Sequence, residues 1–123
     1  MKIFLVGPMG SGKSKIGRIL SEKLSISLFD IDKEIEKDLN MSITEIFASK
    51  GEIFFRNTET DYLIKTKGLR DCIVSTGGGV IEEIKNLEFL KKEANVVFLN
   101  CSVESQYENT KNSAKRPLLL SLI

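Results

Sequence analysis

The sequence predicts an α/β fold, a three-layer sandwich in which helices cover both faces of a central parallel sheet. Short apolar runs of strand length alternate along the chain with longer segments of helical periodicity. The runs are almost uniformly apolar, as expected for strands that are buried on both faces. A chain of 123 residues is long enough for one hydrophobic core, so we expect a single domain over residues 1–123.

The first third of the chain begins with a strand, a helix and a second strand. The strands are the apolar runs 3–6 and 26–29. The helix between them carries apolar side chains on one face: Ile16, Ile19, Leu20 and Leu24. Further on, the segment Ser42 to Glu45 has the form of a capping box. We therefore expect a short helix that starts there, ends at Gly51 and is followed by another helix.

The remaining elements continue the alternation. We expect a strand at residues 72–75, a helix around 87–92, a strand at 96–99 and a polar helix from about residue 103. Cys72 and Cys101 lie in the apolar stretches, which predicts buried core residues with reduced thiols. A disulfide is the minor alternative, and a metal site is less favoured still because the chain has no histidine.

The charge balance and hydropathy exclude several classes of partner. The chain has 18 lysines and arginines against 17 acidic residues, so no broad positive field attracts nucleic acid. No apolar run approaches the roughly 20 residues that span a bilayer, and the first residues lack the pattern of a secretory signal. We expect a cytoplasmic monomer that interacts with neither nucleic acid nor membrane.

A glycine-rich segment follows the first strand and precedes the first helix. Its pattern is Gly7-x-x-x-x-Gly12-Lys13-Ser14, which is typical of a phosphate-binding loop. The glycines allow main-chain N–H groups to surround an anion at the positive end of the helix. Lys13 would reach the outer phosphates of a nucleotide, and the Ser14 hydroxyl would bind magnesium. The alternative is a glycine-rich turn that binds nothing.

Two carboxylates follow the second strand. If the chain stays extended there, Asp30 and Asp32 point to the same side. Because strand ends beside a phosphate loop bind ligands in α/β proteins, one carboxylate could support magnesium while the other takes a proton from an acceptor hydroxyl. The alternative is that these residues cap a helix over 33–39, for which Asp32 has the position of the cap.

An arginine and a run of glycines complete the candidate site. Arg56 and Glu59 are three residues apart and can pair on one helix face. A held arginine fork beside aromatic rings suits a substrate carboxylate, although a solvated ion pair is the simpler interpretation. The glycines at 77–79 close a strand, which allows a ligand to approach the main chain. They could also form only a flexible turn.

Taken together, these segments resemble the shikimate kinase family of small phosphate-loop kinases, whose fold is similar to that of nucleoside monophosphate kinases. The motifs that carry the resemblance occur in the order of the family and cover essentially the whole chain: GPMGSGKS, DID, IFASKGEIFFRNTE, STGGG and RPLL. The resemblance implies transfer of the ATP γ-phosphate to the 3-hydroxyl of shikimate, with magnesium as cofactor, on the way to chorismate and the aromatic amino acids.

The resemblance also implies roles for individual residues. The phosphates would be bound by Gly10, Ser11, Gly12, Lys13, Ser14 and Lys15. Ser14 would bind magnesium and Asp30 would support its waters, while Asp32 would hold the reacting hydroxyl and act as the base. Shikimate would lie in a segment at about 33–62 together with the glycine run, in contact with Phe47, Phe55, Arg56, Gly77, Gly78 and Gly79.

The segment Arg116-Pro117-Leu118-Leu119 matches the family's lid. Residues from about 110 to 123 would form the start of this lid, which would bring Arg116 to the phosphates. Without the resemblance, Arg116 would be a solvated residue at a helix-ending turn. Asn109 stands where family members often place an arginine against the adenine. The family continues well beyond position 123, so we expect a fragment that lacks the last strand and helices. The alternatives are a non-catalytic nucleotide-binding remnant and a gluconate-type kinase.

Overall fold

The computed structural model describes residues 1–93 and 95–99, and its centre is a parallel sheet. The strands are β1 (Lys2–Val6), β2 (Ser27–Asp30), β3 (Cys72–Ser75) and β4 (Val96–Phe98). Their order across the sheet is β2-β3-β1-β4. β1 occupies a central position, where Phe4 is in register with Val74 of β3 on one side and with Val96 of β4 on the other.

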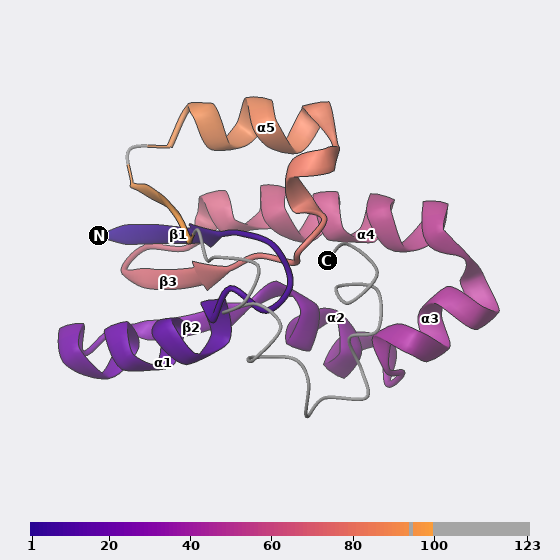
Figure 1. The fold of residues 1–123 in the computed structure, drawn as a ribbon, viewed down its shortest axis with the longest axis horizontal. Coiled ribbons are helices and arrows are strands. Elements are labelled where there is room, and N and C mark those ends of the chain that lie inside the picture. The colour runs from indigo at the N-terminus through magenta and orange to yellow at the C-terminus, as the bar shows by residue number, and fades with distance from the viewer. Residues whose placement is uncertain (94, 100–123) are drawn as a thin grey trace.

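Helices cover the sheet on both faces (Figure 1). The helical elements are α1 (Lys13–Leu24), α2 (Ile31–Leu39), α3 (Ile43–Lys50), α4 (Glu52–Lys65), α5 (Ile84–Lys91) and two short 3₁₀ helices, η1 (Thr66–Gly68) and η2 (Val80–Glu82). Figure 1 shows α1 on one side of the sheet and α5 on the other, with α4 on the same side as α5. The predicted α/β class with a covered parallel sheet is therefore confirmed.

The central strand places apolar side chains on both faces of the sheet. Phe4 packs into the main core, where its ring meets Phe89 of α5 edge-on at 5.9 Å between centroids. On the other face, Leu5 and Leu28 approach Gly17 of α1, and a Cβ on Gly17 would lie only 3.0 Å from a Leu28 methyl. Because Gly17 has no side chain, α1 can pack closely on this face of the sheet.

The apolar side chains of α1 are less buried than their common face suggests. Ile19 is 43% exposed and Leu24 is 41% exposed, whereas the buried residues of the helix are Lys13 and Gly17. A glycine contributes nothing to a hydrophobicity pattern, so the sequence gives no signal of the surface that actually packs on the sheet.

The junction between α3 and α4 agrees with the prediction. The Ser42 hydroxyl accepts a hydrogen bond from the Glu45 N–H at 3.1 Å, and the Glu45 carboxylate accepts one from the Ser42 N–H at 3.4 Å. Gly51 ends α3 and directly precedes α4, with a φ of 88° that L side chains rarely adopt. The capping box and the helix break at Gly51 are therefore confirmed.

Several predictions fall on residues that the structure does not describe: the helix from 103, the lid at 110–123, Arg116, Asn109 and Cys101. Cys72 is buried with a free thiol, as predicted. Within the described ranges, no helix combines the length and the apolar character needed to span a membrane.

Candidate active site at the carboxyl ends of the strands

The phosphate-loop sequence forms the connection between β1 and α1. Gly10 and Gly12 adopt φ values of 82° and 89°, which only glycine reaches without strain. The loop is closed by a hydrogen bond from the Ser11 N–H to the Pro8 carbonyl at 3.1 Å. Lys13 and Ser14 follow as the first residues of α1, whose positive end faces the loop. The predicted strand–loop–helix context is present.

The Lys13 ammonium group is held over this loop. The side chain is buried, and its Nζ donates to the carbonyl of Gly7 and, at 3.1 Å, to that of Pro8. Ser14 is half-buried beside it, and Lys15 is exposed. The loop therefore presents one desolvated cation at its centre, which is where an anion bound by the loop amides would need a counter-charge.

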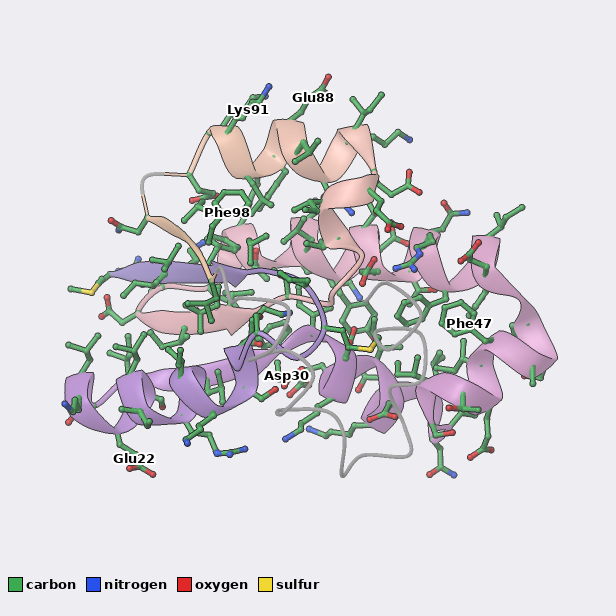
Figure 2. All side chains as sticks on the ribbon, in the orientation of Figure 1. Glu22, Asp30, Phe47, Glu88, Lys91 and Phe98 are labelled. Atoms are coloured by element: carbon green, nitrogen blue, oxygen red, sulfur yellow. The ribbon has the colours of Figure 1, made fainter. Side chains whose placement is uncertain are left out.

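The two carboxylates after β2 lie differently from the prediction. α2 begins at Ile31, so the segment is not extended and Asp32 lies in the first turn of the helix. Asp30 is the N-cap, and its Oδ1 accepts a hydrogen bond from the Lys33 N–H at 3.2 Å. Figure 2 shows Asp30 near the centre of the molecule. The extended backbone that the same-side argument assumed is wrong. Of the two residues in the capping alternative, Asp30 is the cap and Asp32 is not, because the helix begins at Ile31.

Asp32 is half-buried and lies in an electrostatically crowded position. Its Oδ1 is inaccessible to solvent and has no hydrogen-bond partner among the described residues. Burial, reinforced by the negative charge of Asp30, raises the pKa of Asp32 to about 6, against the opposing effects of Lys13 and Arg56. The structure thus brings Asp32 within the electrostatic reach of both predicted cations, with a pKa close to neutrality.

Arg56 is paired with a buried carboxylate. Its Nη1 donates to Glu59 Oε1 at 3.2 Å, and Glu52 lies at 3.9 Å on the more exposed side. Glu59 is only 1% exposed, so the interpretation as a solvated ion pair is wrong. Burial and the neighbouring Asp32 raise the pKa of Glu59 to about 7, although Arg56 opposes the shift.

Two aromatic rings flank the Arg56 guanidinium. Phe47 of α3 and Phe55 of α4 lie 4.9 Å apart between ring centroids, and the guanidinium carbon lies 5.9 and 5.5 Å from the two rings. Figure 2 shows the Phe47 side chain in the part of the molecule formed by α3 and α4. These cation–π contacts and the Glu59 pair fix the guanidinium beside an apolar wall, as the sequence suggested.

The glycine run lies among these groups rather than at a free turn. Gly77 follows β3 and lies against the carboxylates of Asp32 and Glu59, and Gly79 lies against the Arg56 guanidinium. The structure therefore assembles the loop lysine, the acid, the arginine and the glycine run at one end of the sheet, where α/β proteins bind their ligands.

Glu59 is the residue whose importance the sequence reasoning missed. It was expected only as a partner for Arg56, yet its Oε2 is buried without a hydrogen-bond partner in the described structure and lies next to Asp32. A signal was available: Phe55, Glu59 and Leu63 are four residues apart and form the buried face of α4. A carboxylate in the middle of an apolar helical face indicates a buried charge with a role.

The residues that could hold magnesium are few. Among residues 1–93 and 95–99, no group of three or more histidine, cysteine or acidic side chains forms a metal site by itself. Magnesium commonly uses one or two protein oxygens and takes its other ligands from water and substrate phosphates. The Ser14 hydroxyl, at the start of α1, and the Asp30 carboxylate, at the end of β2, are oxygen ligands of the required kind.

The fold and the site define a phosphate-loop phosphotransferase. The family model "Shikimate kinase" matches residues 9–121. The shikimate kinases of Persephonella marina and Sulfurihydrogenibium sp. are 42% and 44% identical to the chain over 117 residues, which is 95% of it. The chain therefore belongs to the shikimate kinase family.

Solved structures agree with this assignment. Shikimate kinase from Acinetobacter baumannii in complex with shikimate matches 95% of the chain with a TM-score of 0.88 and 42% identity. A deoxyadenosine kinase from M. mycoides with bound dATP, at 18% identity and a TM-score of 0.58, shares the fold alone. The chain spans 70 to 71% of the two curated relatives named above and 65% of the A. baumannii structure.

Proposed function

We propose that this chain provides the catalytic site of a shikimate kinase, which transfers the γ-phosphoryl group of ATP to the 3-hydroxyl of shikimate. The observation that carries the proposal is the convergence of a phosphate-loop lysine, a near-neutral carboxylate and a held arginine at one end of the sheet. An anion-binding loop with a separate carboxylate-binding group suits a reaction between a nucleotide and a hydroxy acid. The product would be shikimate 3-phosphate.

The phosphate loop is assigned to ATP. The main-chain amides of residues 10–15 would surround the phosphates, and Lys13 would exchange its present carbonyl partners for phosphate oxygens. Since charge on the transferred group spreads over its outer oxygens, a preorganised ammonium group stabilises the transition state without a large rearrangement.

Asp32 is assigned to the acceptor hydroxyl. With a pKa of about 6, it is ionised at neutral pH and still basic enough to take the hydroxyl proton as the phosphoryl group transfers. Its free Oδ1 supplies the acceptor that a substrate hydroxyl would occupy. Lys13 lowers the pKa of Asp32, so the charge of the phosphate-loop lysine acts directly on the proposed base.

Arg56 is assigned to the shikimate carboxylate. A guanidinium presents several donors in a planar fork, so it can keep its bond to Glu59 and still bind a planar carboxylate. Phe47 and Phe55 would contact the apolar part of the ring, and the main chain of Gly77, Gly78 and Gly79 would approach its hydroxyls.

Magnesium is assigned to Ser14 and Asp30, with phosphates and waters completing its shell. Bound there, the ion would neutralise charge on the phosphates. Arg116, which lies outside the described residues, is proposed as the lid cation that reaches the phosphates when the site closes.

The proposal is tested by an ADP-release assay on the longest expressed form of the protein. ATP and magnesium are supplied with shikimate, with gluconate or with no acceptor. We expect release that depends on shikimate alone. Gluconate-dependent release would favour a gluconate-type kinase instead, and acceptor-independent release would indicate simple ATP hydrolysis.

Calorimetric titration separates an enzyme from a nucleotide-binding remnant. A non-hydrolysable ATP analogue and shikimate are titrated separately into the same preparation. An enzyme should bind both. Binding of the analogue without any response to shikimate would contradict the proposed substrate.

A further inference from the structure

The three glycines that follow β3 each lie against a different part of the site. A Cβ on Gly77 would clash with Glu59 Oε2 and lie 3.0 Å from Asp32 Oδ1. A Cβ on Gly78 would lie 3.2 Å from the main-chain nitrogen of Met9 in the phosphate loop, and one on Gly79 would lie 2.5 Å from the Arg56 guanidinium. Three consecutive residues thus face the acids, the loop and the arginine.

The need for glycine here is one of space, not of backbone conformation. Gly10, Gly12 and Gly51 are the described glycines with positive φ, and none of the run at 77–79 is among them. Gly79 has a φ of −100°, which any residue can adopt. Alanine would therefore fit the local backbone at these positions, and its methyl group would press on the neighbouring functional group.

We propose that the three consecutive glycines are positioning residues, each of which sets a different functional group through the side chain that it lacks. Gly77 sets the carboxylates of Asp32 and Glu59, Gly78 sets the phosphate loop at Met9, and Gly79 sets the Arg56 guanidinium. This assignment rests on the proposed function, and it adds a steric role to the main-chain contacts with substrate.

The atoms nearest to the three glycines differ in how easily an added methyl group could displace them. At Gly77 and Gly79, the closest atoms are the ends of long side chains, so a methyl group would displace a carboxylate or a guanidinium while the fold persists. At Gly78, the closest atoms belong to the main chain of Met9, so the loop itself would shift by a few tenths of an ångström. Displacements of this size matter most for reacting groups, where about 1 Å can cost on the order of a hundredfold in rate.

The test is a set of single alanine variants measured by steady-state kinetics. Gly77→Ala should lower kcat by about a hundredfold with both KM values within about threefold, because it moves the base. Gly79→Ala should raise the KM for shikimate at least about tenfold, and Gly78→Ala should raise the KM for ATP about fivefold. Gly68→Ala is the matched control, because a Cβ there meets nothing within 4 Å and the residue is exposed.

A double-mutant cycle checks the Gly77 contact directly. In Glu59→Asp the shorter side chain withdraws the carboxylate, so adding Gly77→Ala to this variant should cost at least about tenfold less in kcat than adding it to the wild type. Equal costs in the two backgrounds would overturn the assignment of Gly77. Uniform losses in all three alanine variants, in proportion to a fall in melting temperature, would overturn the whole proposal in favour of a purely structural role.

The proposed function can fail independently of this inference. If the wild type shows no shikimate-dependent turnover, calorimetry still compares the variants. Gly78→Ala should then weaken binding of a non-hydrolysable ATP analogue while Gly79→Ala leaves it unchanged. Loss of analogue binding in both variants, or in neither, would overturn the division of roles.

Discussion

The carboxylates of Asp32 and Glu59 reach the same glycine from two different helices. Asp32 lies on α2 and Glu59 on α4, and each brings an oxygen without a hydrogen-bond partner in the described structure against Gly77. Burial raises the pKa of both carboxylates: that of Asp32 to about 6, with the charge of Asp30 adding to the effect, and that of Glu59 to about 7, with the charge of Asp32 adding to the effect. Glu59 therefore keeps its proton up to nearly neutral pH, next to the proposed base Asp32.

The raised pKa of Glu59 predicts a pH-dependent stability. The ordinary value is 4.5 and the folded value is about 7, so between these pH values the folded chain binds more protons than the unfolded chain. The free energy of unfolding should therefore fall as the pH rises from about 4.5 to about 7, on the order of 2 kcal/mol in total. In Glu59→Gln this fall should become smaller, leaving the part that the raised pKa of Asp32 contributes, as measured by urea unfolding at pH 5 and pH 8.

Glu88→Gln is the matched control, because Glu88 is exposed on α5 and projects away from the molecule in Figure 2. It should keep the wild-type difference between the two pH values. If Glu59→Gln keeps that difference as well, another group is responsible for the pH dependence.

Asp32→Asn should reduce turnover far more than nucleotide binding. The amide keeps the shape of the side chain but cannot accept the hydroxyl proton, so we expect kcat to fall by about 10²- to 10⁴-fold. The dissociation constant for the ATP analogue should change by less than about threefold. Asp61→Asn, an exposed residue of α4, should leave both quantities unchanged. An unaltered kcat in Asp32→Asn would remove this residue as the base.

The parts of the fold that could be predicted from the sequence depend on local chemistry. The phosphate loop, the capping box at Ser42 and the break at Gly51 each follow from residues that act within one turn of chain. The strand at Cys72–Ser75 was predicted with its observed bounds, because its apolar residues are followed at once by small polar residues and the glycines.

The errors concern relationships that local pattern does not contain. Asp30 and Asp32 are both acceptable N-caps, and only the packing of α2 decides that Ile31 is its first residue. The burial of Glu59 depends on α2 and the glycine run, which are distant in sequence. Likewise, α1 packs on the sheet through Gly17, a residue without a side chain to reveal the contact.

Lys13→Met should lower the rate of phosphoryl transfer by about 10²- to 10³-fold. Methionine fills similar space, but it removes the buried ammonium group that the loop carbonyls hold. Loss of one preorganised electrostatic group typically costs about 10²- to 10³-fold in kcat. The measurement is the rate of shikimate-dependent ADP release. Lys23→Met, an exposed residue at the end of α1, should retain the wild-type rate, and wild-type transfer in Lys13→Met would contradict the assignment.

Arg56→Lys should weaken shikimate binding selectively. Lysine keeps the charge but loses the planar fork, so it cannot bind Glu59 and a carboxylate at the same time with the same geometry. We expect the KM for shikimate to rise at least about tenfold, while the KM for ATP stays within about threefold. Arg70→Lys serves as the control on an exposed arginine. Equal increases in both KM values would assign the guanidinium to the nucleotide instead.

Ser42→Ala should destabilise the protein without impairing the chemical step. The Ser42 hydroxyl satisfies the Glu45 N–H at the start of α3, and loss of such a cap costs about 1 kcal/mol in the free energy of unfolding. Ser49 lies on the same helix and its hydroxyl bonds to the Glu45 carbonyl, so Ser49→Ala should change the stability little. Because α3 also carries Phe47, fraying at Ser42 should raise the KM for shikimate slightly and leave kcat unchanged. Equal stabilities of the two variants in urea would show that the capping box contributes nothing.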